Sequence, residues 1–99
     1  MNLKFQKNET ELTVSLSGAL NSVSSQELSA FLNAELPGIQ LLTLDFTDCD
    51  FVSSAGLRIL LAAYKRMKQE NGTMRLIHVG TEFMDILKKT GLDAVFEIQ

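Results

Sequence analysis

The chain has 99 residues, of which 45% are apolar and 21% charged, which suits one globular domain near the smallest size that buries a core unaided. Its formal net charge of -3, with basic residues scattered along the sequence, argues against a nucleic-acid-binding protein, because affinity for a phosphate backbone depends on clustered Lys and Arg. With one cysteine and one histidine, the chain has neither an intrachain disulfide nor a structural zinc ligand set. We expect a single domain over residues 1–99 in a reducing, cytoplasmic setting.

The N-terminus, Met1 to Phe5, alternates apolar and polar residues and does not resemble a signal peptide. The longest uninterrupted apolar segment, Ile59 to Tyr64, is too short to cross a bilayer. These patterns predict a soluble protein with no direct membrane insertion.

The first 36 residues predict a hairpin and a helix. Apolar residues repeat with a period of two on either side of polar residues 7–10, as in two antiparallel strands: Leu3, Phe5, Leu12, Val14 and Leu16. The stretch 24–27, Ser-Ser-Gln-Glu, matches a capping box at a helix start. Four apolar residues then share one helical face before Pro37 and Gly38 end the helix: Leu28, Phe31, Leu32 and Leu36.

The second half predicts a strand, a helix and a strand in succession. Residues 41–46 are mostly apolar, as expected for an inner strand covered on both faces or nearly so. Residues 74–79 form a further strand after the turn at Asn71 and Gly72. Between them, from Ser54 onward, one helical stripe contains Leu57, Leu60, Leu61, Tyr64 and Met67. Such a crossover unit makes the third and fourth strands parallel, with a right-handed connection.

A last short helix begins at Gly80 and Thr81, ends at Thr90 and Gly91, and is followed by an edge strand at 95–98. Its apolar residues are Phe83, Ile86 and Leu87. The predicted fold class is therefore α/β, with a mixed sheet of four to five strands and three main helices in the order β-β-α-β-α-β-α.

Two adjacent serines, Ser53 and Ser54, lie where the second helix is expected to begin. Either one could simply be the N-cap, a role that contributes about 1 kcal/mol and needs only one serine. The alternative is a phosphorylation switch, because a phosphate at a helix N-terminus gains from the free amides and the helix dipole. Under this hypothesis the small residues Ala55 and Gly56 leave space around the first turn, so that a partner can approach the hydroxyl.

Serine hydrolase chemistry is the competing enzymatic hypothesis, and it has little support. The G-x-S-x-G elbow is absent, because Val52 stands two residues before Ser54. The only candidate base, His78, is in phase with Met74 and Leu76, which predicts a partly buried sheet residue. We expect no catalytic residues.

Three carboxylates, Asp45, Asp48 and Asp50, precede the second helix and could suggest a metal site. Loops before helices often collect aspartates for turn and dipole reasons, and the EF-hand pattern is absent. We expect no metal and no cofactor.

Three segments resemble a known family, the STAS domain of bacterial anti-sigma factor antagonists. Residues 44–46 with 51–57, LDF and FVSSAGL, resemble its signature of a strand followed by a D/S-S-x-G-L turn. Residues 18–21, GALN, resemble its G-x-L-D element, and residues 90–98 resemble its usual ending. The matches occur in the family's order and span nearly the whole chain.

The resemblance implies a partner switch that controls transcription. The unphosphorylated antagonist would bind an anti-sigma factor with serine kinase activity, phosphorylation would end the interaction, and a phosphatase would restore it. The phosphorylated serine of the family corresponds to Ser54, with Ser53 the less favoured choice. Asn21 and Ser53 stand where the family often has Asp.

The expected partner-binding residues surround this serine: Asn21, Asp50, Val52, Ser53, Ala55, Gly56 and Arg58. The loop from Thr47 to Val52 and the outward flank of the second helix, with Ala62 and Lys65, extend the surface. The alternative function is a non-enzymatic STAS subunit of a lipid-transport ABC system or of a stress-sensing complex, in which the serine is only a cap or contact residue.

Overall fold

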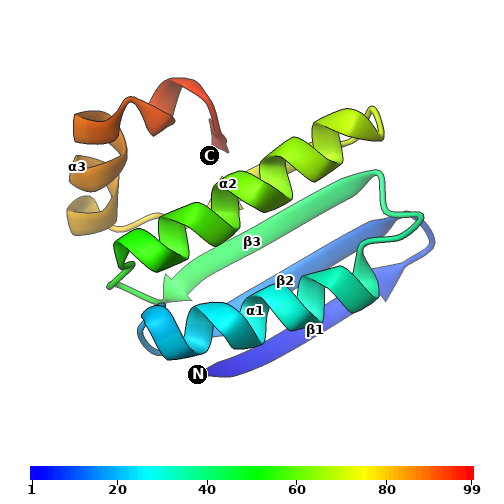
Figure 1. Ribbon diagram of the computed structural model, residues 1–99, viewed down its shortest axis with the longest axis horizontal. Coiled ribbons are helices and arrows are strands. Elements are labelled where there is room, and N and C mark those ends of the chain that lie inside the picture. Colours follow the sequence, from blue (N-terminus) through cyan, green and yellow to red (C-terminus); the bar gives the residue numbers. More distant parts are fainter.

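The computed structural model describes all 99 residues as five strands and three α-helices (Figure 1). In chain order the elements are β1 (Asn2–Asn8), β2 (Glu11–Ser17), α1 (Ser22–Glu35), β3 (Leu41–Asp48), α2 (Ser54–Gln69), β4 (Thr73–Ile77), α3 (Thr81–Thr90), a 3-10 turn (Leu92–Ala94) and β5 (Glu97–Ile98). The predicted fold class and element order are confirmed.

The strands form one mixed sheet in the order β1-β2-β3-β4-β5. The hairpin β1–β2 is antiparallel, whereas β2–β3, β3–β4 and β4–β5 are parallel. The sequence therefore predicted both the hairpin and the parallel crossover correctly. The parallel strands end on the side of the molecule where α2 begins, so the loop with the two serines leaves the sheet at this end (Figure 1).

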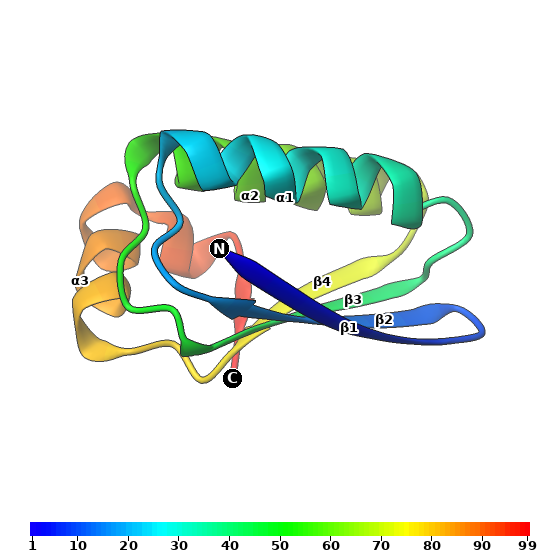
Figure 2. The same ribbon diagram turned by 90° about the horizontal axis from the view of Figure 1, so that it is seen from below.

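The helices α1 and α2 lie side by side across one face of the sheet, and the other face is left uncovered (Figure 2). Between the layers lies one core of 21 buried hydrophobic residues, which includes Leu12, Val14, Leu42, Leu44 and Leu60. The alternation of apolar and polar residues along β2 and β4 places the apolar side chains under the helices. Burial of this apolar surface is the main source of the fold's stability.

The start of α1 differs from the sequence prediction. The helix begins at Ser22, and Asn21 is its N-cap: the Asn21 Oδ1 accepts from the amides of Val23 and Ser24, both at 3.0 Å. The Ser24 Oγ in turn accepts from the Asn21 amide at 2.8 Å. The expected capping box at 24–27 is wrong because Asn caps as well as Ser, and the chain takes the earlier cap.

Ser25, predicted near the helix start, lies instead in the packed interior. It is 2% exposed, and its Oγ has no hydrogen-bond partner. An unpaired buried hydroxyl carries an uncompensated desolvation cost of about 1–3 kcal/mol. We expect Ser25→Ala to raise the free energy of unfolding by about 1 kcal/mol in urea titrations. A loss of stability in Ser25→Ala would show that this hydroxyl has a partner.

Candidate functional site

The loop before α2 is held in place by the segment that precedes α1. The amide of Leu20 donates to the Phe51 carbonyl and the amide of Ser53 donates to the Leu20 carbonyl, each at 2.8 Å. Leu20 and Val52 form an isolated parallel bridge. The beginnings of α1 and α2 are thus tied together, which fixes the position of the two serines.

Further contacts fix the other end of the same loop. The amide of Gly18 donates to the Asp48 carbonyl at 3.0 Å, and the amide of Cys49 donates to the Phe46 carbonyl at 3.1 Å. Between Ser15 and Ser17 the β2–β3 register shifts, a bulge-like irregularity of the kind often found beside functional sites. No local pattern in the sequence indicated that Leu20 and Gly18 position this loop.

The two adjacent serines have different surroundings. Ser53 is the N-cap of α2, with extended backbone, and its Oγ accepts from the Gly56 amide at 3.2 Å. Ser54 is the first residue of the helix, its side chain is exposed, and its hydroxyl makes no hydrogen bond within the chain. Capping therefore occupies Ser53 and leaves Ser54 free.

The start of α2 is electropositive in its own right. No acidic residue lies in the first turn. The Gly56 amide is bound by the cap side chain and the Leu57 amide donates to the Ser53 carbonyl, which leaves the amides of Ser54 and Ala55 without partners. Arg58, one turn after Ser54, is exposed.

The difference between the two serines can be tested by substitution. We expect Ser53→Ala to lower the free energy of unfolding by about 1 kcal/mol, because it removes the cap of α2. Ser54→Ala is the matched control and should change it by less than about 0.5 kcal/mol, as for an exposed side chain with no partner. Equal losses in urea titrations would contradict the assignment of the cap to Ser53.

Two residues expected to contact a partner face the interior instead. Val52 is 3% exposed and belongs to the core, and Gly56 is buried. A Cβ at Gly56 would lie 2.9 Å from both Leu20 Cγ and Val52 Cγ1. Their burial argues against direct contact of Val52 and Gly56 with a partner, and the glycine allows close packing of α2 against the loop.

The remaining expected site residues lie at the surface. Asp50, Ser54 and Arg58 are exposed, and Ser53 and Ala55 are half-buried beside them. Asn21 is also exposed, but its side chain caps α1. Ala62 and Lys65 lie further along the outward flank of α2, and both are exposed.

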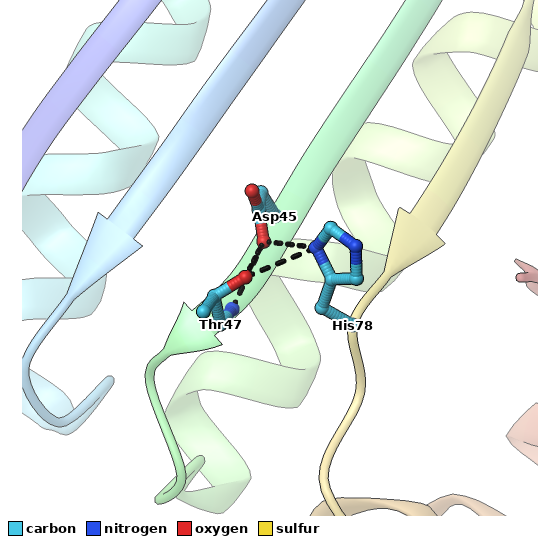
Figure 3. A network of polar contacts seen from close by, with 3 residues as sticks. All are labelled: Asp45, Thr47 and His78. Carbon is cyan, nitrogen blue, oxygen red and sulfur yellow. Dashed lines mark hydrogen bonds and ion pairs between the residues drawn. The ribbon is translucent and has the colours of Figure 1, made fainter.

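His78 is exposed and not partly buried as predicted. Its φ of 56° ends β4 at Ile77, before the predicted end at residue 79, and the side chain joins Asp45 and Thr47 of β3 (Figure 3). His78 Nδ1 lies 2.9 Å from Asp45 Oδ1 and 3.0 Å from Thr47 Oγ1. The hydrogen bonds of His78 are to Asp45 and Thr47 and not to Ser54, so the hydrolase constellation is not assembled.

The contacts of Asp45 in the folded chain lower the pKa of its carboxyl group. Burial acts to raise the pKa of its carboxyl group, but hydrogen bonds from Thr47 and His78 and the charge of His78 together outweigh this, so the pKa lies below its usual 3.8. A lowered pKa contributes stability that is present above the unfolded value and is lost as pH falls through the folded value.

We therefore expect the free energy of unfolding to fall below about pH 4, more steeply in the wild type than in Asp45→Asn. Urea titrations between pH 2 and 7 would measure both curves. Asp93→Asn, which removes an exposed carboxylate, is the control and should follow the wild type. Parallel curves for the wild type and Asp45→Asn would contradict the effect of the Thr47 and His78 contacts.

The chemistry of this end of the molecule is limited in two further respects. No group of three His, Cys, Asp or Glu side chains lies close enough together to hold a metal ion. Cys49 is 1% exposed, and its burial raises the pKa of the thiol, which disfavours the thiolate needed for nucleophilic attack.

None of the helices is long and apolar enough to span a membrane.

Comparison with models of known protein families assigns the chain to one of them. A family model described as the Mlab STAS domain matches residues 3–98. The chain belongs to the STAS domain family. The resemblance found in the three sequence segments is thereby confirmed over nearly the whole chain.

Individual relatives agree with this assignment. The STAS domain is 29% identical over 99 residues to BtrV of Bordetella bronchiseptica, provisionally named an anti-sigma factor antagonist; the match covers 99% of this chain and 85% of BtrV. A crystal structure of an anti-sigma factor antagonist from Mycobacterium paratuberculosis is 26% identical, with a TM-score of 0.85 over 98% of this chain and 83% of the other. The fold is also that of Bacillus SpoIIAA in its phosphorylated form, with a TM-score of 0.79, 13% identity, and coverage of 99% of this chain and 91% of the other.

Proposed function

We propose that this STAS domain is an anti-sigma factor antagonist that is switched off by phosphorylation of Ser54. The observation that carries the proposal is the division of roles between the serines: Ser53 caps α2, and the Ser54 hydroxyl is exposed and unbonded. The names of the relatives with comparable length support the class of function. A phosphorylated form of a protein with the same fold supports the kind of modification.

The partner is an anti-sigma factor with serine kinase activity, and a separate phosphatase reverses the modification. In the transfer, the Ser54 oxygen attacks the γ-phosphorus of ATP; an O–P bond to the serine forms, the bond to ADP breaks, and the serine proton passes to a base of the kinase. The STAS domain supplies the acceptor and no catalysis of its own. The exchange takes place in the cytoplasm.

The phosphate has favourable contacts within the chain and unfavourable ones across an interface. The free amides of Ser54 and Ala55 and the positive end of α2 stabilise a phosphate at this position. Arg58, one turn further, can pair with it. Toward a partner, the phosphate adds about two negative charges to a domain with a net charge of -3, so an interface that covers Ser54 would have to bury them.

The proposed contact surface consists of exposed or half-exposed groups around this acceptor: Asn21, Asp50, Ser53, Ser54, Ala55 and Arg58. Val52 and Gly56 act beneath it by packing. Asn21 is the N-cap of α1, at a position where the family often has Asp. We expect its neutral side chain to affect the rate of phosphorylation more than the fold.

The test is phosphorylation by the serine-kinase anti-sigma factors of the host, each purified and incubated with ATP and the STAS domain. Intact-mass measurements should show one added phosphate on the wild type and on Ser53→Ala, and none on Ser54→Ala. Modification of Ser54→Ala, or of none of the three proteins by any of the kinases, would overturn the proposal. The second outcome would favour the alternative of a structural STAS subunit.

A further inference from the structure

The strand β1 forms an open edge of the sheet. It has seven residues, of which only Leu3 is half-buried and the rest are exposed. None of the backbone hydrogen bonds outside the regular helices and strands involves residues 2–8, so the outward amides and carbonyls of β1 have no partner in the chain. The opposite edge is formed by β5, which has two residues.

An open edge of this length is a template for pairing with another strand. Proteins usually blunt such edges with proline, a bulge or a short strand, and β1 has none of these: its seven residues pair with β2 in unbroken register. The lysines Lys4 and Lys7 are its only protection. The edge can therefore pair with a strand that places no positive charge opposite these two lysines.

The edge also has an exposed aromatic residue at its centre. Phe5 is 53% exposed and packs on Phe31 of α1, with ring centroids 5.1 Å apart. Lys7 also faces the helix layer, because its Nζ lies 3.5 Å from Glu35 Oε1 of α1. Odd-numbered residues of β1 thus face the helices, and Lys4 and Gln6 face the uncovered side of the sheet.

We propose that β1 pairs antiparallel with β1 of a second copy, about a two-fold axis at Phe5. Pairing about this axis places Phe5 opposite Phe5 of the other copy, Lys4 opposite Gln6, and Leu3 opposite Lys7. No like charges lie opposite one another, and the two phenylalanines form the aromatic cross-strand pair that stabilises a sheet. The side chains on each face stay on that face.

Neighbouring registers are less favourable. A two-fold axis at Lys4 would place the two Lys4 ammonium groups opposite one another, which is destabilising. An axis at Gln6 would place Phe5 opposite Lys7 and lose the aromatic pair. The lysines therefore act to select one register rather than to prevent pairing.

The dimer is compatible with the proposed function and does not depend on it. A two-fold axis perpendicular to the sheet reverses the strand direction, so the ends of β3 that lead to Ser54 lie at opposite ends of the joined sheets. Both acceptor sites remain uncovered, and one dimer can engage two partners. Since a single pair of seven-residue strands buries less than the about 1,200 Å² of a standard interface, we expect a weak, reversible dimer.

Sedimentation equilibrium between 5 µM and 1 mM would test the association. We expect the weight-average mass of the wild type to rise toward twice that of the monomer, and Phe5→Lys to weaken the dimer at least tenfold. Phe51→Lys is the matched control, because Phe51 is 52% exposed but lies in the loop before α2. A wild type that stays monomeric to 1 mM, or equal effects of the two substitutions, would overturn the proposal.

Two further measurements identify the strand and its register. Deuterium exchange of the wild type should slow at the outward amides of β1 as concentration rises; unchanged exchange throughout β1 would overturn the proposal. Under oxidising conditions Phe5→Cys should form a disulfide dimer faster than Lys4→Cys, because residues 4 of the two copies would lie beyond the about 7 Å Cα separation that a disulfide spans. The native Cys49 is buried, and faster crosslinking of Lys4→Cys would exclude this register.

Discussion

Replacing Ser54 by aspartate is expected to lower the affinity for the anti-sigma factor by about 100-fold or more. The carboxylate introduces an unpaired charge into a surface that the partner covers, and a charge placed in this way costs about 3 kcal/mol of binding free energy. The fold should be unaffected or slightly more stable, because the first turn of α2 has no acidic residue and a carboxylate there complements the helix dipole by about 0.3–1 kcal/mol. Titration calorimetry with the purified partner measures the change.

The control for this substitution is Ser54→Asn, which has nearly the same shape as aspartate and no charge. We expect it to weaken binding by less than about fivefold, which corresponds to about 1 kcal/mol. If Ser54→Asp binds as tightly as the wild type, charge at this position does not control the interaction. If Ser54→Asn binds as weakly as Ser54→Asp, shape rather than charge would explain the loss.

The largest loss of stability among the site residues is expected for Gly56→Val, at about 3 kcal/mol. A Cβ at this position would lie 2.9 Å from atoms of both Leu20 and Val52, each of which is buried and cannot move aside easily. The overpacking would push α2 away from the loop that positions Ser54. Urea titration followed by circular dichroism measures the change in unfolding free energy.

Ala62→Val is the matched control on the same helix. Ala62 is exposed, so the same residue type introduced there should cost only the lower helix propensity of valine, about 0.5 kcal/mol. Similar losses at both positions would mean that Gly56 is not required for packing. An unchanged stability of Gly56→Val together with lost binding would restore the interpretation that the glycine keeps the outer surface low for a partner.

The architecture could be predicted from periodicity because each element carries its own pattern. The period of two in Leu12, Val14 and Leu16 and the helical stripe after Ser54 specify which faces are buried, and the order strand, helix, strand specifies a parallel pairing. The fold class and the parallel central strands followed directly. The STAS signature around Ser54 added the family.

The N-caps of the helices were harder to predict than the architecture, because several residues compete for each N-cap position. Ser24 and Ser25 fit a capping box in the sequence, yet Asn21 provides the cap and Ser25 is buried without a partner. At α2 the sequence offered both Ser53 and Ser54 as caps. Only the geometry of the first turn, with the Gly56 amide on Ser53 Oγ, assigns the cap and leaves Ser54 free.

Contacts between segments that are distant in the sequence could not be predicted either. The pairing of Leu20 with Val52, and the consequent need for glycine at 56, depends on packing between parts of the chain that are more than 30 residues apart. The backbone of His78 departs from the strand phase, so its side chain reaches Asp45 and Thr47, which no local pattern indicates. The strand at 41–46 was predicted to be covered on both faces or nearly so, whereas α1 and α2 cover only one face of the sheet (Figure 2).

The most direct test of the central claim is phosphosite mapping by mass spectrometry of the protein isolated from its native host, in growth and under stress. The peptide that contains Ser53 and Ser54 should carry phosphate on Ser54, with an occupancy that changes between the two conditions. Phosphate on neither serine in any condition, together with normal function of Ser54→Ala, would contradict the account and leave Ser54 as an ordinary surface residue of a structural STAS subunit.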